Sequence, residues 1–162
     1  MKILIVCSSN VCRSPYAEFM LKKIVSSNPV LKNNIEWIKS SAVFNKSKTI
    51  SPNTKKCLLR EGFSENEIDG FKPSYKKTSV SIFEEADVII GMTKSHKFFT
   101  TKKFREKFMT LSEIAYGSYR PIPDPFLVTD FDEYLKCMNV IKDALIAFSD
   151  RIKKQFENTA KV

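Results

Sequence analysis

The first 25 residues combine a buried-strand pattern, a short polar loop and a helix pattern. The run from Ile3 to Val6 is apolar at every position and mostly β-branched, which is typical of a strand covered on both faces of a parallel sheet. After Ser14, Pro15 stands where a helix begins, and apolar residues recur at intervals of three and four up to Val25. Because a strand buried on both faces needs helices on both sides of its sheet, this layout predicts an α/β fold.

The rest of the chain alternates between the same two patterns. We expect further strands at residues 35–42, 87–92 and 108–111, and further helices from Pro52 to near Gly62, across residues 94–107 with a break near Thr100-Thr101, and from Phe131 to Ile152. We expect the first helical region to end at Asn28-Pro29, and residues 64–78 to form a surface connection with at most one helical turn. Ser81 and Glu84 predict a capping box for a short helix, with Ser79 as the alternative cap.

Length and composition place these elements in one domain. The chain has 162 residues, of which 43% are hydrophobic, and this is enough to build a full core and argues against disorder. We therefore predict a single domain spanning residues 1–162, folded as a three-layer αβα sandwich around a mainly four-stranded parallel sheet. The loop after the first strand then lies at the carboxyl end of the sheet, where such folds bind ligands.

That loop, Cys7-Ser8-Ser9-Asn10-Val11-Cys12-Arg13-Ser14, has the chemistry of an anion site. It directs backbone N–H groups and the positive end of a helix dipole at its centre, and the same field favours the Cys7 thiolate. The Arg13 guanidinium can hold two oxygens of a phosphate, and the Ser14 hydroxyl can donate a hydrogen bond to the sulfur. The alternative is that Cys7 is a small buried hydrophobe at the end of a strand.

A second motif lies more than a hundred residues later. In Pro121-Ile122-Pro123-Asp124-Pro125-Phe126, alternate prolines forbid a helix and hold an extended, stiffened segment. Such a segment can hold the Asp124 carboxyl in place. By itself, an Asp beside Pro is more often an ordinary turn carboxylate, and this motif alone favours that interpretation of Asp124.

Together the two motifs resemble those of the low-molecular-weight protein tyrosine phosphatases. The segment from Val6 to Pro15 is similar to the signature loop of that family, and Asp124-Pro125 is similar to its general-acid pair. The resemblance implies Cys7 as nucleophile and Asp124 as general acid and base. It also implies that Ser14 assists departure of the sulfur, and that phosphate is bound by the side chain of Arg13 and by the loop amides, which belong to Ser8, Ser9, Asn10, Val11, Cys12 and Arg13.

The reaction implied by this resemblance is hydrolysis of phosphotyrosine and small aryl phosphates through a phosphocysteine intermediate, with neither metal nor cofactor. Its partners are then tyrosine-phosphorylated proteins or peptides, with phosphate and other oxyanions as ligands. The resemblance also implies that Cys12 can form a reversible disulfide with Cys7 under peroxide. The alternative for Cys12 is a packing role in the core.

The chain departs from the family pattern at several positions. Lys46 stands where several members carry an aromatic residue that forms a wall of the cleft, and Phe44, two residues earlier, can substitute for that aromatic. The charge of Lys46 by itself favours acidic phosphopeptides. Phe126 and Leu127 replace two tyrosines, although Phe126 can still stack on a phenyl phosphate. Lys72-Pro73 occupies the region where many members have a histidine that supports the loop. We expect His96, the one histidine of the chain, at the surface.

Charge and cysteine content bear on partners and compartment. The chain has 27 basic and 18 acidic residues and therefore a net charge of +9. Such an excess of basic side chains usually lies on a solvated face of the protein, and it also attracts anionic substrates. The sequence has neither zinc-finger spacing nor an RNA-binding aromatic box, so we expect no nucleic-acid binding. It has no secretion leader, and no apolar run approaches the ~20 residues that span a bilayer, so we expect no membrane span. Four cysteines without metal-ligand spacing indicate reduced thiols. We expect a cytoplasmic monomer.

Two other functions are compatible with this loop. Some arsenate reductases share the nucleophile loop, but those coupled to thioredoxin need further cysteines near the third strand, and residues 70–95 contain none. A non-catalytic phosphoprotein-binding module needs only the anion loop. The joint presence of Cys7, Arg13, Ser14 and Asp124 favours an enzyme instead.

Overall fold

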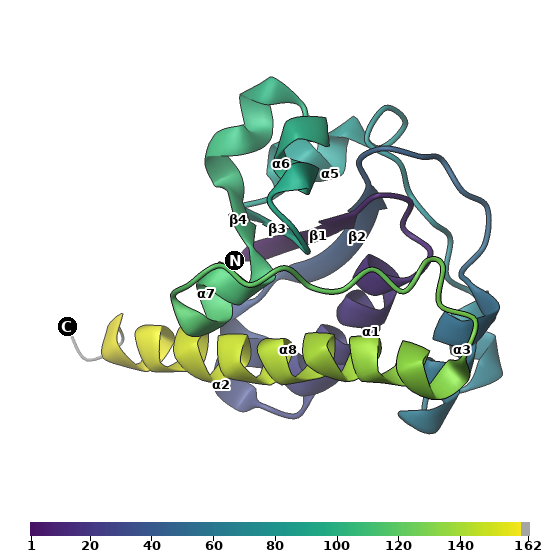
Figure 1. Ribbon diagram of the computed structural model, residues 1–162. Helices are drawn as coiled ribbons and strands as arrows, with labels where there is room; N and C mark the ends of the chain where they lie inside the picture. The colour runs from purple at the N-terminus through teal and green to yellow at the C-terminus, as the bar shows by residue number, and fades with distance from the viewer. Residues whose placement is uncertain (160–162) are drawn as a thin grey trace.

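The computed structural model describes residues 1–159, and its strands form one parallel sheet (Figure 1). The strand order is β2-β1-β3-β4, with β2 at Trp37–Ala42, β1 at Lys2–Cys7, β3 at Val88–Gly91 and β4 at Phe108–Thr110. Every neighbouring pair is parallel. β1 is therefore an interior strand, and residues 3–6 are completely buried, as the apolar run predicted.

Side chains of β1 alternate between two cores, one on each face of the sheet. Ile3 and Ile5 pack on one face, while Leu4 and Val6 pack on the other. Figure 1 shows α1, α2 and α8 on one side of the sheet and α5 and α6 on the other. The helices are α1 (Arg13–Ser26), α2 (Pro29–Asn34), α3 (Pro52–Arg60), α4 (Glu65–Asp69), α5 (Val80–Glu85), α6 (Ser95–Phe99), α7 (Leu111–Tyr116) and α8 (Phe131–Thr159), together with the 3-10 helix η1 (Lys102–Lys107). The predicted three-layer sandwich is confirmed.

Two helices were not predicted, although both carry end signals in the sequence. Asn28 accepts a hydrogen bond from the Leu31 N–H at 3.2 Å and so caps α2, with Pro29 at its first turn. The dipeptide that ends the first helical region therefore also begins the next one. Thr110 and Glu113 form a capping box at the start of α7, and Gly117 ends that helix with a left-handed φ of 76°.

The predicted capping box of Ser81 and Glu84 is wrong. The helix begins two residues earlier, at Val80, and the alternative cap residue, Ser79, occupies the N-cap position without a side-chain hydrogen bond. The predicted break near Thr100 is confirmed, since Thr100 and Thr101 separate α6 from η1. The surface connection contains one short helix, α4.

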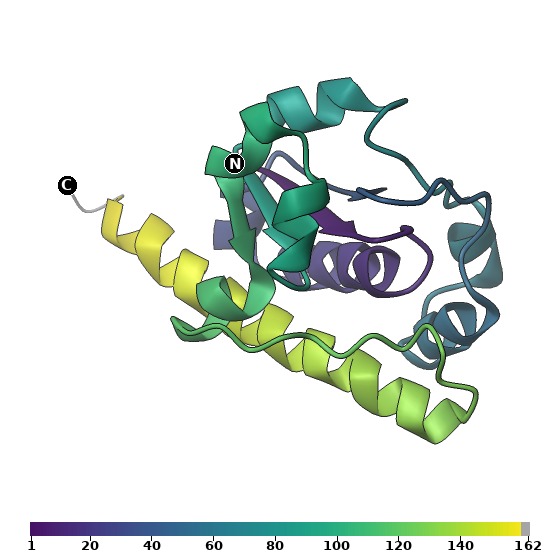
Figure 2. The same ribbon diagram turned by 45° about the horizontal axis from the view of Figure 1, so that its top comes forward.

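The proline-containing segment between α7 and α8 is extended, as predicted, and Figures 1 and 2 show it in green. It is tied to the sheet where β3 ends, because the Ile122 N–H donates to the Met92 carbonyl at 3.2 Å. This contact brings the segment to the edge of the sheet where β1 also ends. Within residues 1–159, no helix is long and apolar enough to cross a membrane.

Close packing of β3 against β4 requires a glycine at position 91. A Cβ added at Gly91 would lie 2.1 Å from Cζ of Phe108, far inside contact distance. We expect Gly91→Ala to lower the free energy of unfolding by about 1–3 kcal/mol through overpacking, measured by urea denaturation. Phe108→Leu removes the obstructing ring atoms, so Gly91→Ala should cost much less in that background. An equal cost in both backgrounds would contradict the overpacking explanation.

Candidate active site

The loop between β1 and α1 places Cys7 at the end of the strand and Arg13 at the first residue of the helix. Asn10 has a left-handed φ of 55°, a conformation that Asn tolerates better than most residues. This turn lets the chain curve back toward the start of α1. The Ser14 hydroxyl then donates to Cys7 Sγ at 3.0 Å.

The side chain of Asn10 holds this loop from behind. Its Nδ2 donates to Ser14 Oγ at 2.9 Å and to Ser40 Oγ at 2.8 Å, while its Oδ1 accepts from the Ser74 N–H at 2.9 Å. Ser14 Oγ thus accepts a hydrogen bond from Asn10, so the Ser14 hydroxyl proton is directed at the Cys7 sulfur. A hydrogen bond donated to sulfur stabilises negative charge on it.

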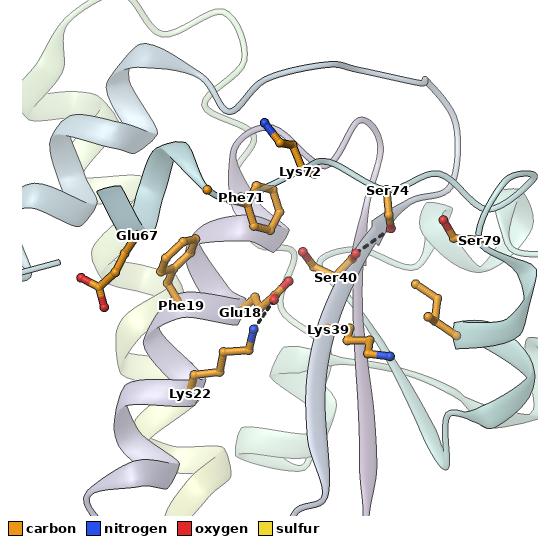
Figure 3. Close-up of a pocket in the computed structure, with 12 residues that line it drawn as sticks. Glu18, Phe19, Lys22, Lys39, Ser40, Glu67, Phe71, Lys72, Ser74 and Ser79 are labelled. Carbon is orange, nitrogen blue, oxygen red and sulfur yellow. Dashed lines mark hydrogen bonds and ion pairs between the residues drawn. The ribbon is translucent and has the colours of Figure 1, made fainter. Parts of the chain in front are cut away.

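Ser40 and Ser74 were not identified from the sequence. Figure 3 shows them side by side at the edge of β2, where the Ser74 hydroxyl donates to the Ser40 carbonyl at 2.8 Å. The segment that follows Lys72-Pro73 therefore supports the loop through Ser74, without a histidine in this segment. Ser40 lies within β2 and Ser74 in an irregular connection, and no local pattern distinguishes either serine from its neighbours.

Arg13 and Asp124 come together across 111 positions of sequence. Nη2 of Arg13 lies 2.6 Å from Oδ2 of Asp124, and Nη1 donates to the Ile122 carbonyl at 3.5 Å. The Arg13 side chain is 5% exposed, whereas that of Asp124 is 52% exposed. The two predicted motifs thus form one site, in which a buried guanidinium has further N–H groups for an oxyanion and a carboxyl stands at the opening.

These residues line a cleft of about 220 Å³. Its lining residues are Cys7, Ser8, Ser9, Val11, Cys12, Arg13, Phe44, Asn45, Asp124 and Phe126. Both aromatic residues are more than half exposed, as expected for a cleft rim, and the Phe44 ring packs on Phe99 at a centroid distance of 4.7 Å. Lys46 is not among the lining residues. Its neighbour Asn45 is, and its Nδ2 donates to Ser9 Oγ at 3.2 Å.

Ser40 and Ser74 also line a wider pocket of about 460 Å³ (Figure 3). It is bordered by Phe19 and Phe71, with the Glu18–Lys22 ion pair beside them. No cysteine and no arginine lines this pocket. The smaller cleft, which contains the thiol, the guanidinium and the carboxyl, is therefore the candidate active site.

The prediction that His96 lies at the surface is wrong, since it is 2% exposed. Its Nε2 lies 3.2 Å from Ser8 Oγ, and its Nδ1 accepts from the N–H groups of Met92 and Thr93 at 3.2 and 3.3 Å. Burial, with the Arg13 charge as a smaller cause, lowers the pKa of His96 to about 4. His96 is therefore neutral near pH 7. It supports the loop at Ser8, from a different element than the family pattern suggested.

Two of the four cysteines line the cleft. Cys7 and Cys12 are buried, unbonded thiols in the same loop, and Cys12 occupies the N-cap position of α1. Across residues 1–159, no cluster of three or more His, Cys, Asp or Glu side chains is arranged to hold a metal ion.

Comparisons with known proteins agree on one family. The family model described as "Low molecular weight phosphotyrosine protein phosphatase" matches residues 2–158. A protein-arginine-phosphatase of Bacillus subtilis is 27% identical, over 95% of this chain and 98% of its own. A low molecular weight protein-tyrosine-phosphatase, PtpB, of Staphylococcus epidermidis is 28% identical, over 97% of this chain and all of its own.

A solved structure is similar throughout its length. It is that of the YwlE arginine phosphatase, in a cysteine-to-serine mutant whose active site serine is phosphorylated. The TM-score is 0.78 and the sequence identity is 26%, with 97% of this chain and 96% of that chain covered.

The burial of His96 has a measurable consequence, because it is the one histidine in the chain. We expect its imidazole NMR signals to titrate near pH 4 rather than 6.5. Between pH 4 and pH 6.5, His96 is protonated in the unfolded chain but not in the folded chain. The free energy of unfolding therefore falls as the pH falls from 6.5 to 4, and His96 does not affect it above pH 6.5. The loss amounts to roughly 3 kcal/mol.

Urea denaturation at pH 4.5 and pH 7 measures this loss, and His96→Gln is the control that cannot titrate. The variant should lose less stability between the two pH values than the native chain. A titration of His96 near pH 6.5 would contradict the buried, neutral assignment.

Proposed function

The chain belongs to the low molecular weight phosphotyrosine protein phosphatase family, and from this premise we propose that it hydrolyses phosphotyrosine in proteins through a phosphocysteine intermediate on Cys7. One observation carries the proposal. Arg13 and Asp124, 2.6 Å apart, lie in the same cleft as a cysteine whose sulfur accepts a hydrogen bond from Ser14. A nucleophile, an oxyanion clamp and a proton donor are then within reach of one phosphoryl group.

In the first step the Cys7 thiolate attacks phosphorus, the S–P bond forms and the bond from phosphorus to the phenolic oxygen breaks. Arg13 and the loop amides of residues 8–13 hold the non-bridging oxygens. The phosphoryl group competes with Asp124 for the guanidinium, which frees the carboxyl to carry a proton. Asp124 then gives this proton to the departing phenolate oxygen.

In the second step the ionised Asp124 takes a proton from water, whose oxygen attacks phosphorus. The S–P bond breaks, inorganic phosphate is released and Cys7 leaves as thiolate. The Ser14 hydroxyl, 3.0 Å from the sulfur and oriented by Asn10, stabilises this leaving group. The same hydrogen bond therefore serves both attack and departure.

The shape of the cleft supports an aromatic substrate. Phe44 and Phe126 flank the cleft and Val11 adds an apolar contact, so a phenyl ring has surfaces on which to pack. The net charge of +9 supports acidic phosphopeptides over neutral ones.

A second candidate substrate is phosphoarginine. The observation that favours it is the similarity, over nearly the whole chain, to a protein named protein-arginine-phosphatase. The same loop would hold the phosphoryl group, with a P–N bond broken in place of P–O and Asp124 giving its proton to nitrogen. The two substrates differ in the group that would pack against Phe44 and Phe126, which is a phenyl ring in phosphotyrosine and a guanidinium group in phosphoarginine.

Regulation and location are further parts of this proposal. Cys7 and Cys12 lie in one loop, so peroxide can oxidise Cys7 to a sulfenic acid that condenses with the Cys12 thiol and releases water. A thiol nucleophile of this kind supports a reducing, cytoplasmic setting. We propose that the protein acts there as a monomer.

The mechanism is tested by hydrolysis of para-nitrophenyl phosphate at mildly acidic pH in the presence of EDTA. We expect the native chain to be active, Cys7→Ser to be inactive, and Asp124→Ala to lose about 10²–10⁴-fold in kcat, the usual contribution of a positioned acid. Cys137→Ser and Asp132→Ala are matched controls outside the cleft lining and should keep native activity. Activity that survives in Cys7→Ser would exclude the phosphocysteine route.

The substrate class is tested with two peptides of equal charge and length, one with phosphotyrosine and one with phosphoarginine. We expect kcat/KM to favour phosphotyrosine, because the aromatic walls can pack on a phenyl ring, and we expect Phe126→Ala to reduce this preference. A preference for phosphoarginine in the native chain would establish the second candidate instead.

A further inference from the structure

The side chain of Ser8 joins the cleft to the buried histidine behind it. Ser8 lines the cleft next to Cys7, and its Oγ lies 3.2 Å from Nε2 of His96. Serine at this position has no part in the mechanism proposed above, in which Ser8 contributes only its backbone N–H. The hydroxyl is a polar group at the wall of an anion site.

The hydrogen bonds of His96 determine which of its nitrogens carries the proton. Nδ1 faces the N–H groups of Met92 and Thr93, and both of these groups are donors, so Nδ1 must be the acceptor. Burial keeps the ring neutral, so the single ring proton lies on Nε2. His96 therefore donates, and Ser8 Oγ accepts.

This contact constrains the hydroxyl proton of Ser8. A serine oxygen that accepts from one side has its own proton free to donate elsewhere. Among residues 1–159, His96 is the only hydrogen-bond partner of Ser8 Oγ, and the open space beside Ser8 is the cleft. The proton is thus available to an anion in the cleft.

The backbone at both ends of this contact is held independently of it. The Ser8 carbonyl accepts from the N–H groups of Phe44 and Asn45 at 3.0 and 2.9 Å. The His96 carbonyl accepts from the Thr100 N–H at 3.0 Å and from the Thr100 hydroxyl at 2.9 Å. Loss of the contact between the side chains therefore changes the direction of the hydroxyl more than the path of the loop.

We propose that His96 is a positioning residue that acts through Ser8, holding the Ser8 hydroxyl so that it donates to a non-bridging oxygen of the bound phosphoryl group. This inference rests on the proposed phosphatase function and adds a side-chain donor to the loop amides. A hydrogen bond to a charged oxygen is one of the stronger kinds, and its strength increases as negative charge develops on that oxygen.

The test uses two replacements that separate the two nitrogens of His96. His96→Gln keeps an N–H donor near the position of Nε2, whereas His96→Asn keeps an acceptor near Nδ1 and is too short to reach Ser8. We expect Ser8→Ala and His96→Asn each to lower kcat about tenfold. His96→Gln should retain most of the native kcat, and the neighbouring Ser95→Ala, on the exposed side of the same turn, should not change it.

A double-mutant cycle then decides whether the histidine acts through the serine. We expect His96→Asn to have little further effect on kcat in the Ser8→Ala background. If His96→Asn lowers kcat equally in both backgrounds, its role is structural and the proposal is wrong. Full activity of Ser8→Ala would also overturn it. Thermal unfolding of each variant ensures that folded proteins are compared.

Binding of inorganic phosphate separates this inference from the proposed function. Isothermal titration should show weaker phosphate binding in Ser8→Ala and His96→Asn than in the native chain, by about tenfold, and near-native binding in His96→Gln. If the native chain turns over no phosphomonoester yet shows this order of affinities, the proposed function fails and the role of His96 stands. Equal affinities in all variants would overturn the role of His96 even in an active enzyme.

Discussion

The buried side chain of Asn10 is the contact on which the geometry of the candidate site depends. It uses both Nδ2 protons and its oxygen, and it joins the loop to α1, to β2 and to the segment at Ser74. A buried amide left without these partners would cost on the order of 1–3 kcal/mol per unsatisfied group, so the loop has one favourable shape. The same contacts direct the Ser14 proton at the sulfur of Cys7.

The sheet supplies the frame for this loop. β1 is paired on both sides, so Cys7 is held at the end of an interior strand, and the loop leaves the sheet at a fixed position. The extended segment with Asp124 is held by a backbone contact at the end of the neighbouring β3. Because adjacent parallel strands end at the same edge, two motifs distant in sequence meet there, and Arg13 can pair with Asp124.

Several features were beyond the reach of the sequence patterns. His96 lies in a basic, weakly periodic stretch that looks solvent-exposed, and its burial follows from how α6 folds back on the end of β3. Lys46 does not line the cleft, whereas its neighbour Asn45 does. Ser40 and Ser74 support Asn10 from two elements that no local pattern connects. α2 and α7 have N-cap residues that are recognisable in the sequence. They were not predicted because six residues are too few to show a helical hydrophobic pattern.

By itself the sequence determined the αβα class, the strand that ends at the loop, and the residues of the two motifs, because hydrophobic periodicity and the spacing of reactive groups are local properties. The pairing of Arg13 with Asp124 and the support of the loop by Asn10 and His96 were decided by the tertiary structure. Each of these depends on contacts between elements distant in the chain, and on burial, which sets both the protonation of His96 and the need of each polar group for a partner.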